Sequence, residues 1–134
     1  SGDVEMYEYI LRAIGYAMQG NANAHCLFML YGPLTRNGKS TFVRAIGEFF
    51  NDYGINISQS SLAAFKNDPA KPRPDIASLK GRRFVAVAEL PKTIKFDSEF
   101  VKSLTGQDTI SARKLYQNDA EKFINEGVFH FFTL

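Results

Sequence analysis

The stretch Tyr31-Gly32-Pro33-Leu34-Thr35-Arg36-Asn37-Gly38-Lys39-Ser40-Thr41 decides the fold of this chain. Residues 26–30 before it are all apolar, which is typical of a strand buried on both faces of a parallel sheet. After it, apolar side chains recur at helical spacing, at Phe42, Val43, Ile46, Phe49 and Phe50. A glycine-containing turn between a strand and a helix predicts a phosphate-binding loop.

The residue types in this turn suit a triphosphate. Gly38 lets the backbone come close, while the N–H groups and the dipole of a helix start attract phosphate charge. Lys39 adds a fixed positive charge, and the hydroxyl of Ser40, with Thr41 as a second candidate, could ligate a magnesium ion. We therefore expect the phosphates to bind at Gly32, Pro33, Leu34, Thr35, Arg36, Asn37, Gly38, Lys39, Ser40 and Thr41.

The spacing of this turn departs from the usual pattern. Five residues separate Gly32 from Gly38, where the usual phosphate loop has four, and Pro33 stands where that pattern places a glycine. The loop is therefore expected to be one residue longer than usual. The alternative is a Gly-Lys-Ser sequence that occurs by chance in a surface turn.

Length and composition narrow the class of protein. At 134 residues, with 45% hydrophobic and 22% charged residues, the chain is expected to form one globular domain with its own core. The single cysteine, Cys26, excludes an internal disulfide, and no cysteine or histidine cluster has the spacing of a zinc site. No membrane-spanning run or signal peptide is visible in the sequence, so we expect a cytoplasmic protein.

Residues 1–20 are expected to form a packing helix ahead of the phosphate loop. Asp3 is placed to cap its start, and one helical face is apolar. That face consists of Val4, Tyr7, Leu11, Ile14 and Met18. His25, which opens the next strand, is interpreted as a structural residue.

Basic side chains outnumber acidic ones between residues 66 and 83. Residues 68–74 are rich in proline and are expected to form a loop. We interpret the basic residues as the solvated rim of this region. They are Lys66, Lys71, Arg73, Lys80, Arg82 and Arg83.

The next apolar run, residues 84–89, predicts a strand that ends in a carboxylate, Glu89. In a parallel α/β sheet ligands lie outside the carboxyl ends of the strands, so Glu89 is expected beside Lys39 and Ser40. A carboxylate there could help to hold magnesium or polarise the attacking water. Lys39 and Glu89 are therefore the candidate catalytic residues, and Ser40 and Glu89 the candidate metal ligands. The alternative is an acidic residue that serves solubility alone.

The last third of the chain predicts a helix, a hairpin and a strand. Phe96, Phe100 and Leu104 share a helical face that Asp97 or Ser98 could cap, with Lys102 on the polar side. Residues 109–116 and 121–124 have β character and are separated by a turn. Residues 128–134 form a further apolar strand, and His130 within it is expected in the core.

With these segments in hand, the chain resembles the superfamily 3 helicases, in particular the helicase domains attached to primases of phages, plasmids and poxviruses. Residues 31–33 and 37–41 resemble their Walker A loop, and residues 79–84 leading to Ala88-Glu89-Leu90 resemble their Walker B strand. Residues 102–113 resemble the motif that lies between Walker B and motif C, and this match is the most specific of the three.

The resemblance implies a three-layer α/β P-loop NTPase domain of the AAA+ type over residues 1–134, with a mainly parallel sheet and an inserted β-hairpin. It implies ATP and Mg²⁺ as ligands, a ring of usually six subunits, and translocation along single-stranded DNA. In such a ring the hairpin would face the pore, where cations meet phosphates and a tyrosine stacks on a base. The candidate DNA-binding residues are Lys102, Arg113, Lys114 and Tyr116. Strand alternation sends Arg113 and Lys114 to opposite faces, and Lys114 is the preferred contact.

In these helicases a polar sensor residue ends the strand after that motif, and an arginine finger follows further on. Here the corresponding strand is where the sequence stops, so we expect a fragment of a longer phage or mobile-element replication protein from a bacterial host cell. The isolated chain is then expected to be monomeric, with little ATP turnover. Two other classes stay open: a P-loop kinase, which needs an acceptor pocket and a lid, and a non-catalytic DNA-binding or assembly module that uses nucleotide to hold its shape.

Overall fold

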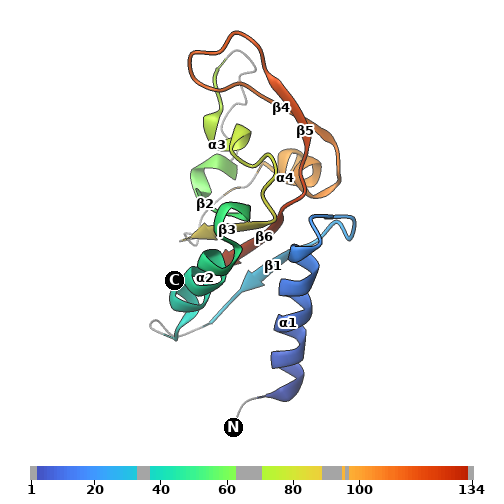
Figure 1. Cartoon of the computed structure of the whole chain (residues 1–134), viewed down its shortest axis with the longest axis vertical. Coiled ribbons are helices and arrows are strands. Elements are labelled where there is room, and N and C mark those ends of the chain that lie inside the picture. Colours follow the sequence, from blue (N-terminus) through green and yellow to red (C-terminus); the bar gives the residue numbers. More distant parts are fainter. Residues whose placement is uncertain (1–2, 33–36, 63–70, 89–94, 96, 133–134) are drawn as a thin grey trace.

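The computed structural model describes residues 3–32, 37–62, 71–88, 95 and 97–132. Helices and strands alternate along most of the chain, as the sequence predicts (Figure 1). The first half of the chain forms α1 (Val4–Met18), β1 (Leu27–Leu30), α2 (Lys39–Phe50), the 3₁₀ turn η1 (Asn51–Tyr53), β2 (Gly54–Ser58) and a second 3₁₀ turn, η2 (Gln59–Leu62). The second half forms α3 (Pro74–Ala77), β3 (Phe84–Ala88), α4 (Ser98–Thr105), β4 (Thr109–Ala112), β5 (Glu121–Ile124) and β6 (Val128–Phe132).

A parallel sheet positions the candidate site. Its four strands lie in the order β1-β6-β3-β2, and all three neighbouring pairs are parallel. Leu30 pairs with Phe132, and Val87 pairs with Phe131, so the carboxyl ends of β1, β6 and β3 lie at one edge. This arrangement confirms the predicted mixed α/β class with a mainly parallel sheet.

Side chains from alternate positions of the central strands build a core on each face of the sheet. On β3, Phe84 and Ala86 enter one core with residues of α1 and α2, whereas Val85 and Val87 enter the other. The second core also holds residues of α3, α4 and the two hairpin strands. The sheet is thus a middle layer between the α1 and α2 helices and a layer of short helices and hairpin.

The N-terminal helix has the predicted start but packs through a different face. Asp3 caps it by accepting a hydrogen bond from the backbone N–H of Met6 at 3.2 Å. The buried positions are Ala13 and Ala17, because small side chains allow the helix to approach the sheet closely. Of the predicted apolar face, Ile14 packs against the core, but the prediction was wrong for Val4, Tyr7, Leu11 and Met18, which are exposed. The first half of α1 stands away from the body of the protein in Figure 1.

The first strand is not buried on both faces, contrary to the prediction from its apolar sequence. β1 lies at one end of the sheet, and its residues alternate between exposed and half-buried. Phe28 and Leu30 face the core shared with α1 and α2, while Met29 is 56% exposed. The apolar run therefore has only one covered face among the described residues.

The predicted hairpin is confirmed, with a shorter first strand. β4 and β5 pair antiparallel, with Ile110 opposite Phe123, and both side chains are buried. β4 ends at Ala112 instead of Tyr116, so residues 113–120 form the connecting loop. Asn125 secures the exit of the hairpin: its buried amide donates to the carbonyls of Leu104 and Gly127, each at 2.8 Å.

Candidate functional site

Gly38 marks the point at which the loop after β1 becomes α2. Its φ of 83° and ψ of −2° lie in the left-handed region, which glycine enters without strain. Its carbonyl accepts the first helical hydrogen bond from Phe42 N–H at 2.9 Å, and α2 then begins at Lys39. A Cβ added at Gly38 would have no heavy atom of the described residues within 4 Å.

Lys39 folds back over Gly32. Its Nζ donates a 2.6 Å hydrogen bond to Oδ1 of Asn37. A Cβ added at Gly32 would overlap the Asn37 amide nitrogen and come within 3.2 Å of Lys39 Nζ. Only glycine leaves room for this arrangement, which gives Gly32 a structural role despite the unusual spacing of the loop. Pro33, Leu34, Thr35 and Arg36 lie outside the described residues.

The start of α2 brings positive charge and backbone N–H donors to the carboxyl edge of the sheet. The first N–H groups of a helix have no partner within it, and here Gly38 supplies no side-chain cap. The macrodipole adds a partial positive charge at the same point, beside the Lys39 ammonium. Ser40 and Thr41 in the first turn are exposed, so their hydroxyls are available to a ligand. This arrangement suits an anion with several oxygen atoms.

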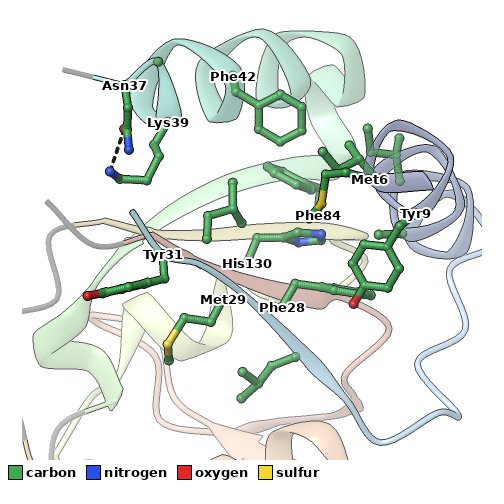
Figure 2. Close-up of a pocket in the computed structure, with 16 residues that line it drawn as sticks. Met6, Tyr9, Phe28, Met29, Tyr31, Asn37, Lys39, Phe42, Phe84 and His130 are labelled. Carbon is green, nitrogen blue, oxygen red and sulfur yellow. Dashed lines mark hydrogen bonds between the residues drawn. The ribbon is translucent and has the colours of Figure 1, made fainter. Parts of the chain in front are cut away.

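A pocket of about 490 Å³ opens between this helix start, β1 and α1 (Figure 2). Asn37, Gly38 and Lys39 form its polar end. The rest of the wall is apolar and aromatic, with Tyr9 from α1, Phe28 from β1 and further residues from α2, β3 and β6. The volume falls in the range of small-molecule sites.

His130 is a polar group in the apolar part of this wall. It is 4% exposed, its ring stacks on Phe28 with centroids 5.1 Å apart, and it lies 4.5 Å from the ring of Phe84. Burial lowers the pKa of His130 from 6.5 to about 4, so the imidazole is neutral at pH 7. The prediction that His130 is buried in the core is confirmed. Sequence reasoning did not connect it with the loop, because that requires the pairing of β6 with β1.

The candidate metal ligands are only partly described. Ser40 lies in the first turn of α2, at the carboxyl edge of the sheet. Glu89 follows the last residue of β3 and lies outside the described residues, so its predicted position beside Lys39 stays a prediction. Within the described ranges no three His, Cys, Asp or Glu side chains cluster as a metal site would require. Ser40 and Glu89 therefore stay predictions as metal ligands.

The four candidate DNA-binding residues lie on α4 and the hairpin loop. Lys102 is exposed on α4, and Tyr116 is fully exposed in the loop with a positive φ of 61°. Lys114 forms a 2.9 Å ion pair with Glu121. The argument from strand alternation was wrong for Arg113 and Lys114, because both lie beyond the end of β4.

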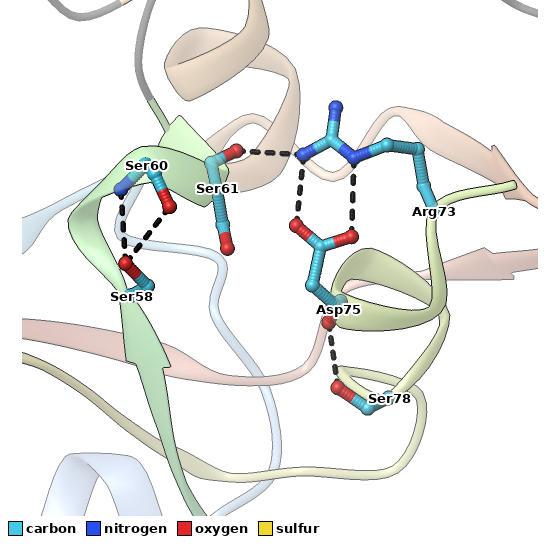
Figure 3. Close-up of polar contacts among 6 residues, drawn as sticks. All are labelled: Ser58, Ser60, Ser61, Arg73, Asp75 and Ser78. Carbon is cyan, nitrogen blue, oxygen red and sulfur yellow. Dashed lines mark hydrogen bonds and ion pairs between the residues drawn. The ribbon is translucent and has the colours of Figure 1, made fainter. Parts of the chain in front are cut away.

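Basic residues of the 66–83 run hold parts of the fold together, contrary to our interpretation of a solvated rim. Arg73 makes two hydrogen bonds to Asp75, at 3.0 and 3.1 Å, and donates to the Ser61 carbonyl at 2.8 Å (Figure 3). Burial alone would raise the pKa of Asp75, but hydrogen bonds from Arg73 and Ser61 outweigh it and hold the pKa below 3.8.

Arg82 and Arg83 behave similarly, whereas Lys71 and Lys80 are exposed. Arg82 donates to the carbonyls of Ser78 and Asp52, and Arg83 donates to the Met18 carbonyl at 3.0 Å. Arg83 also stacks over the ring of Tyr53, 4.4 Å from its centroid. The contacts with Asp52, Met18 and Tyr53 span long sequence separations, and no local pattern in the sequence signals them.

Comparison with known proteins places the loop in a defined family. Residues 30–133 match the family described as "Family of unknown function (DUF5906)". The chain belongs to this family. The match starts at the last residue of β1, so the DUF5906 region contains the loop, α2 and every later element.

A viral protein is similar to most of this DUF5906 chain. It is a protein of Acanthamoeba polyphaga mimivirus named "Putative helicase L207/L206", with 28% identity over 115 residues. The aligned region is 86% of this chain but 12% of that protein, so the chain spans only a small part of its relative.

No helix within the described residues is both long and apolar enough to cross a membrane.

Proposed function

We propose that this DUF5906 chain is the ATP-binding core of a DNA helicase of the superfamily 3 type, from a viral, phage or other mobile-element replication protein. In this proposal it works in the cytoplasm of the host cell, hydrolyses ATP with Mg²⁺, and moves along single-stranded DNA as a ring. The observation that carries the proposal is the placement of Lys39. It stands at the open start of α2, next to Gly38, where β1 ends at the carboxyl edge of a parallel sheet.

The relative supports the proposal from a second direction. The mimivirus protein carries the name of a helicase, and the similarity extends over most of this chain. An ATP-driven motor needs a site that binds a triphosphate and a surface that meets DNA. The helix start and the hairpin loop are the parts of this chain that fit these two tasks.

The residues of the chain would divide the work as follows. Gly38 and the first N–H groups of α2 hold phosphate oxygens, and Lys39, whose ammonium keeps its hydrogen bond to Asn37, donates a further one to an outer phosphate. Ser40 and Glu89 are the proposed ligands of Mg²⁺, which neutralises phosphate charge when bound. Glu89 is also the proposed group that orients the attacking water. Lys102, Arg113, Lys114 and Tyr116 are the proposed DNA contacts.

Turnover measurements separate this proposal from the two other classes. ATP hydrolysis should be measured with and without single-stranded DNA, on the chain and on any longer polypeptide that contains it. Stimulation by DNA supports the helicase. Turnover that needs a small phosphate acceptor supports a kinase, and binding without turnover under every condition supports a non-catalytic module.

A further inference from the structure

The pocket beside Lys39 has a second polar feature, in its apolar part. Nδ1 of His130 lies 3.0 Å from the carbonyl oxygen of Val128. A carbonyl can only accept, so in the neutral ring Nδ1 carries the proton and Nε2 has a free lone pair. Among the described residues none donates a hydrogen bond to Nε2, although that atom is buried. An unsatisfied buried acceptor is unfavourable and uncommon, and it calls for an explanation.

His130 and the loop are on the same side of the sheet. α2 packs on the core that includes Phe84 and Phe28, and these are the rings that contact His130. His130 pairs with Phe28, two residues before the pair at the carboxyl edge, Leu30 and Phe132. At about 3.3 Å per residue the histidine lies roughly 7 Å inside that edge. The pocket lined by Gly38 and Lys39 nevertheless reaches His130, so both lie in one cavity.

The wall around His130 suits a flat ring. Phe28, Phe42 and Tyr9 line the pocket, and Figure 2 shows the His130 ring among the aromatic side chains, with Met6 and Tyr9 on the α1 side. Aromatic side chains bind nucleotide bases by stacking. Met6 and Tyr9 are 55% and 58% exposed, so they can move aside without disturbing the core.

We propose that this pocket holds the base of the nucleotide, and that Nε2 of His130 accepts a hydrogen bond from the 6-amino group of adenine. The inference rests on the proposed function, because it takes the phosphates to lie at Gly38 and Lys39. It adds a specificity-determining residue. A base without the amino group leaves Nε2 unsatisfied, and a 6-oxo base places a second acceptor opposite it, so both are bound less tightly than adenine.

The test compares three purine triphosphates that differ in the group at position 6 of the base; inosine triphosphate also carries a proton on N1. Binding of the magnesium complexes of ATP, purine riboside triphosphate and inosine triphosphate is measured by calorimetry on the wild-type chain. We expect ATP to bind about tenfold more tightly than the other two, as for the loss of one hydrogen bond in a buried site. In His130→Phe, which keeps an aromatic ring between Phe28 and Phe84, the three affinities should become equal.

The possible outcomes separate the role of His130 from the proposed binding of ATP. Equal binding of all three triphosphates by the wild type, with binding lost in Lys39→Ala, overturns the role of His130 and leaves the proposed function standing. Discrimination that survives in His130→Phe also overturns it. No binding of any triphosphate overturns both proposals.

A second measurement uses the wild-type protein and therefore does not depend on the folding of the His130→Phe variant. The ¹⁵N resonance of His130 Nε2 is followed in the wild type, with His25→Asn used for assignment. Magnesium-ATP should shift this resonance as the lone pair accepts a proton donor, and purine riboside triphosphate should shift it much less. Equal shifts with both ligands would remove the inference.

Discussion

Nζ of Lys39 and Oδ1 of Asn37 lie 2.6 Å apart, and this hydrogen bond places the lysine ammonium over the bare face of Gly32. The ammonium is thus held beside the open start of α2 before any ligand arrives. Preorganisation of this kind lowers the entropy lost on binding. A Cβ at position 32 would require the Asn37 amide to move, so the observed position of this pair depends on Gly32.

Replacing Lys39 with alanine should weaken binding of magnesium-ATP by about 10- to 100-fold, because hydrogen bonds to a charged group contribute about 1.5–3 kcal/mol. Calorimetry on the chain gives the affinity. Lys71→Ala is the control, since Lys71 is also exposed to solvent but lies outside the pocket. Unchanged ATP affinity in a folded Lys39→Ala protein would remove the phosphate-loop assignment.

Gly32→Ala should lower ATP affinity while the protein keeps its fold. The new methyl group would displace the Asn37 amide, and Lys39 would lose the partner that positions it. Gly47→Ala is the matched control, because a Cβ there has no heavy atom within 4 Å and Gly47 lies inside α2. That control should stabilise the helix by about 0.5–1 kcal/mol and leave ATP affinity unchanged. Equal ATP affinities in both variants would show that Asn37 does not position Lys39.

Arg73→Ala should lower the free energy of unfolding by about 1–3 kcal/mol, because it removes a paired, partly buried group and leaves Asp75 without its main partner. Arg12→Ala is the control: its ion pair with Glu8 is exposed and should contribute less than about 1 kcal/mol. Urea unfolding of the two variants gives both values. If Arg73→Ala lowers the free energy of unfolding no more than Arg12→Ala does, the contacts of Arg73 do not stabilise the fold, and the interpretation of Arg73 as a solvated residue stands.

The order of elements could be read from the sequence because their boundaries are set by local chemistry. Asp97 caps α4 by accepting from Phe100 N–H at 3.0 Å, and Gly38 takes up the left-handed backbone before α2. The exposed face of α1 could not be read, because the apolar character of Val4 does not show whether the sheet reaches it, and Val4 is exposed. The roles of Arg82 and His130 depend on residues far away in the sequence, and composition and spacing carry no information about such contacts.

Stability should depend on pH through His130. Its folded pKa is about 4, below the 6.5 of the unfolded chain, so folding favours the neutral ring. This stabilisation is complete above pH 6.5 and is lost as the pH falls towards 4. The difference corresponds to about 3 kcal/mol. Urea unfolding between pH 7 and pH 4 should therefore show a fall in free energy that is smaller by about this amount in His130→Phe.

The control for this titration is the second histidine. His25 is exposed and has a positive φ of 49°, which asparagine tolerates well, so His25→Asn should keep the fold, and its fall in free energy is compared with that of His130→Phe. If the free energy of unfolding depends on pH in the same way in His130→Phe and in the wild type, His130 is protonated at its ordinary pKa in the folded protein.

The hairpin loop leads to a prediction about DNA. Tyr116 is fully exposed in this loop, and Lys114 in the same loop forms an ion pair with Glu121. Tyr116→Ala should weaken binding of a single-stranded oligonucleotide by about tenfold, since stacking of one base contributes about 1–3 kcal/mol. Tyr116→Phe should bind almost as well as the wild type. Fluorescence anisotropy at several salt concentrations gives both the affinity and its salt dependence.

Lys114 tests the electrostatic part of the same contact. If it meets a phosphate, Lys114→Ala lowers affinity and makes it less steeply dependent on salt, because one fewer counterion is released. Glu121→Gln should act in the opposite direction, since it frees the Lys114 ammonium from its 2.9 Å ion pair. ATP affinity should be unchanged in both variants, because neither residue lines the pocket at Lys39.

The hairpin is excluded as the DNA contact if Tyr116→Ala and Lys114→Ala both bind the oligonucleotide with wild-type affinity and salt dependence. Tyr7→Ala, which removes an exposed tyrosine from α1, is the control for non-specific stacking.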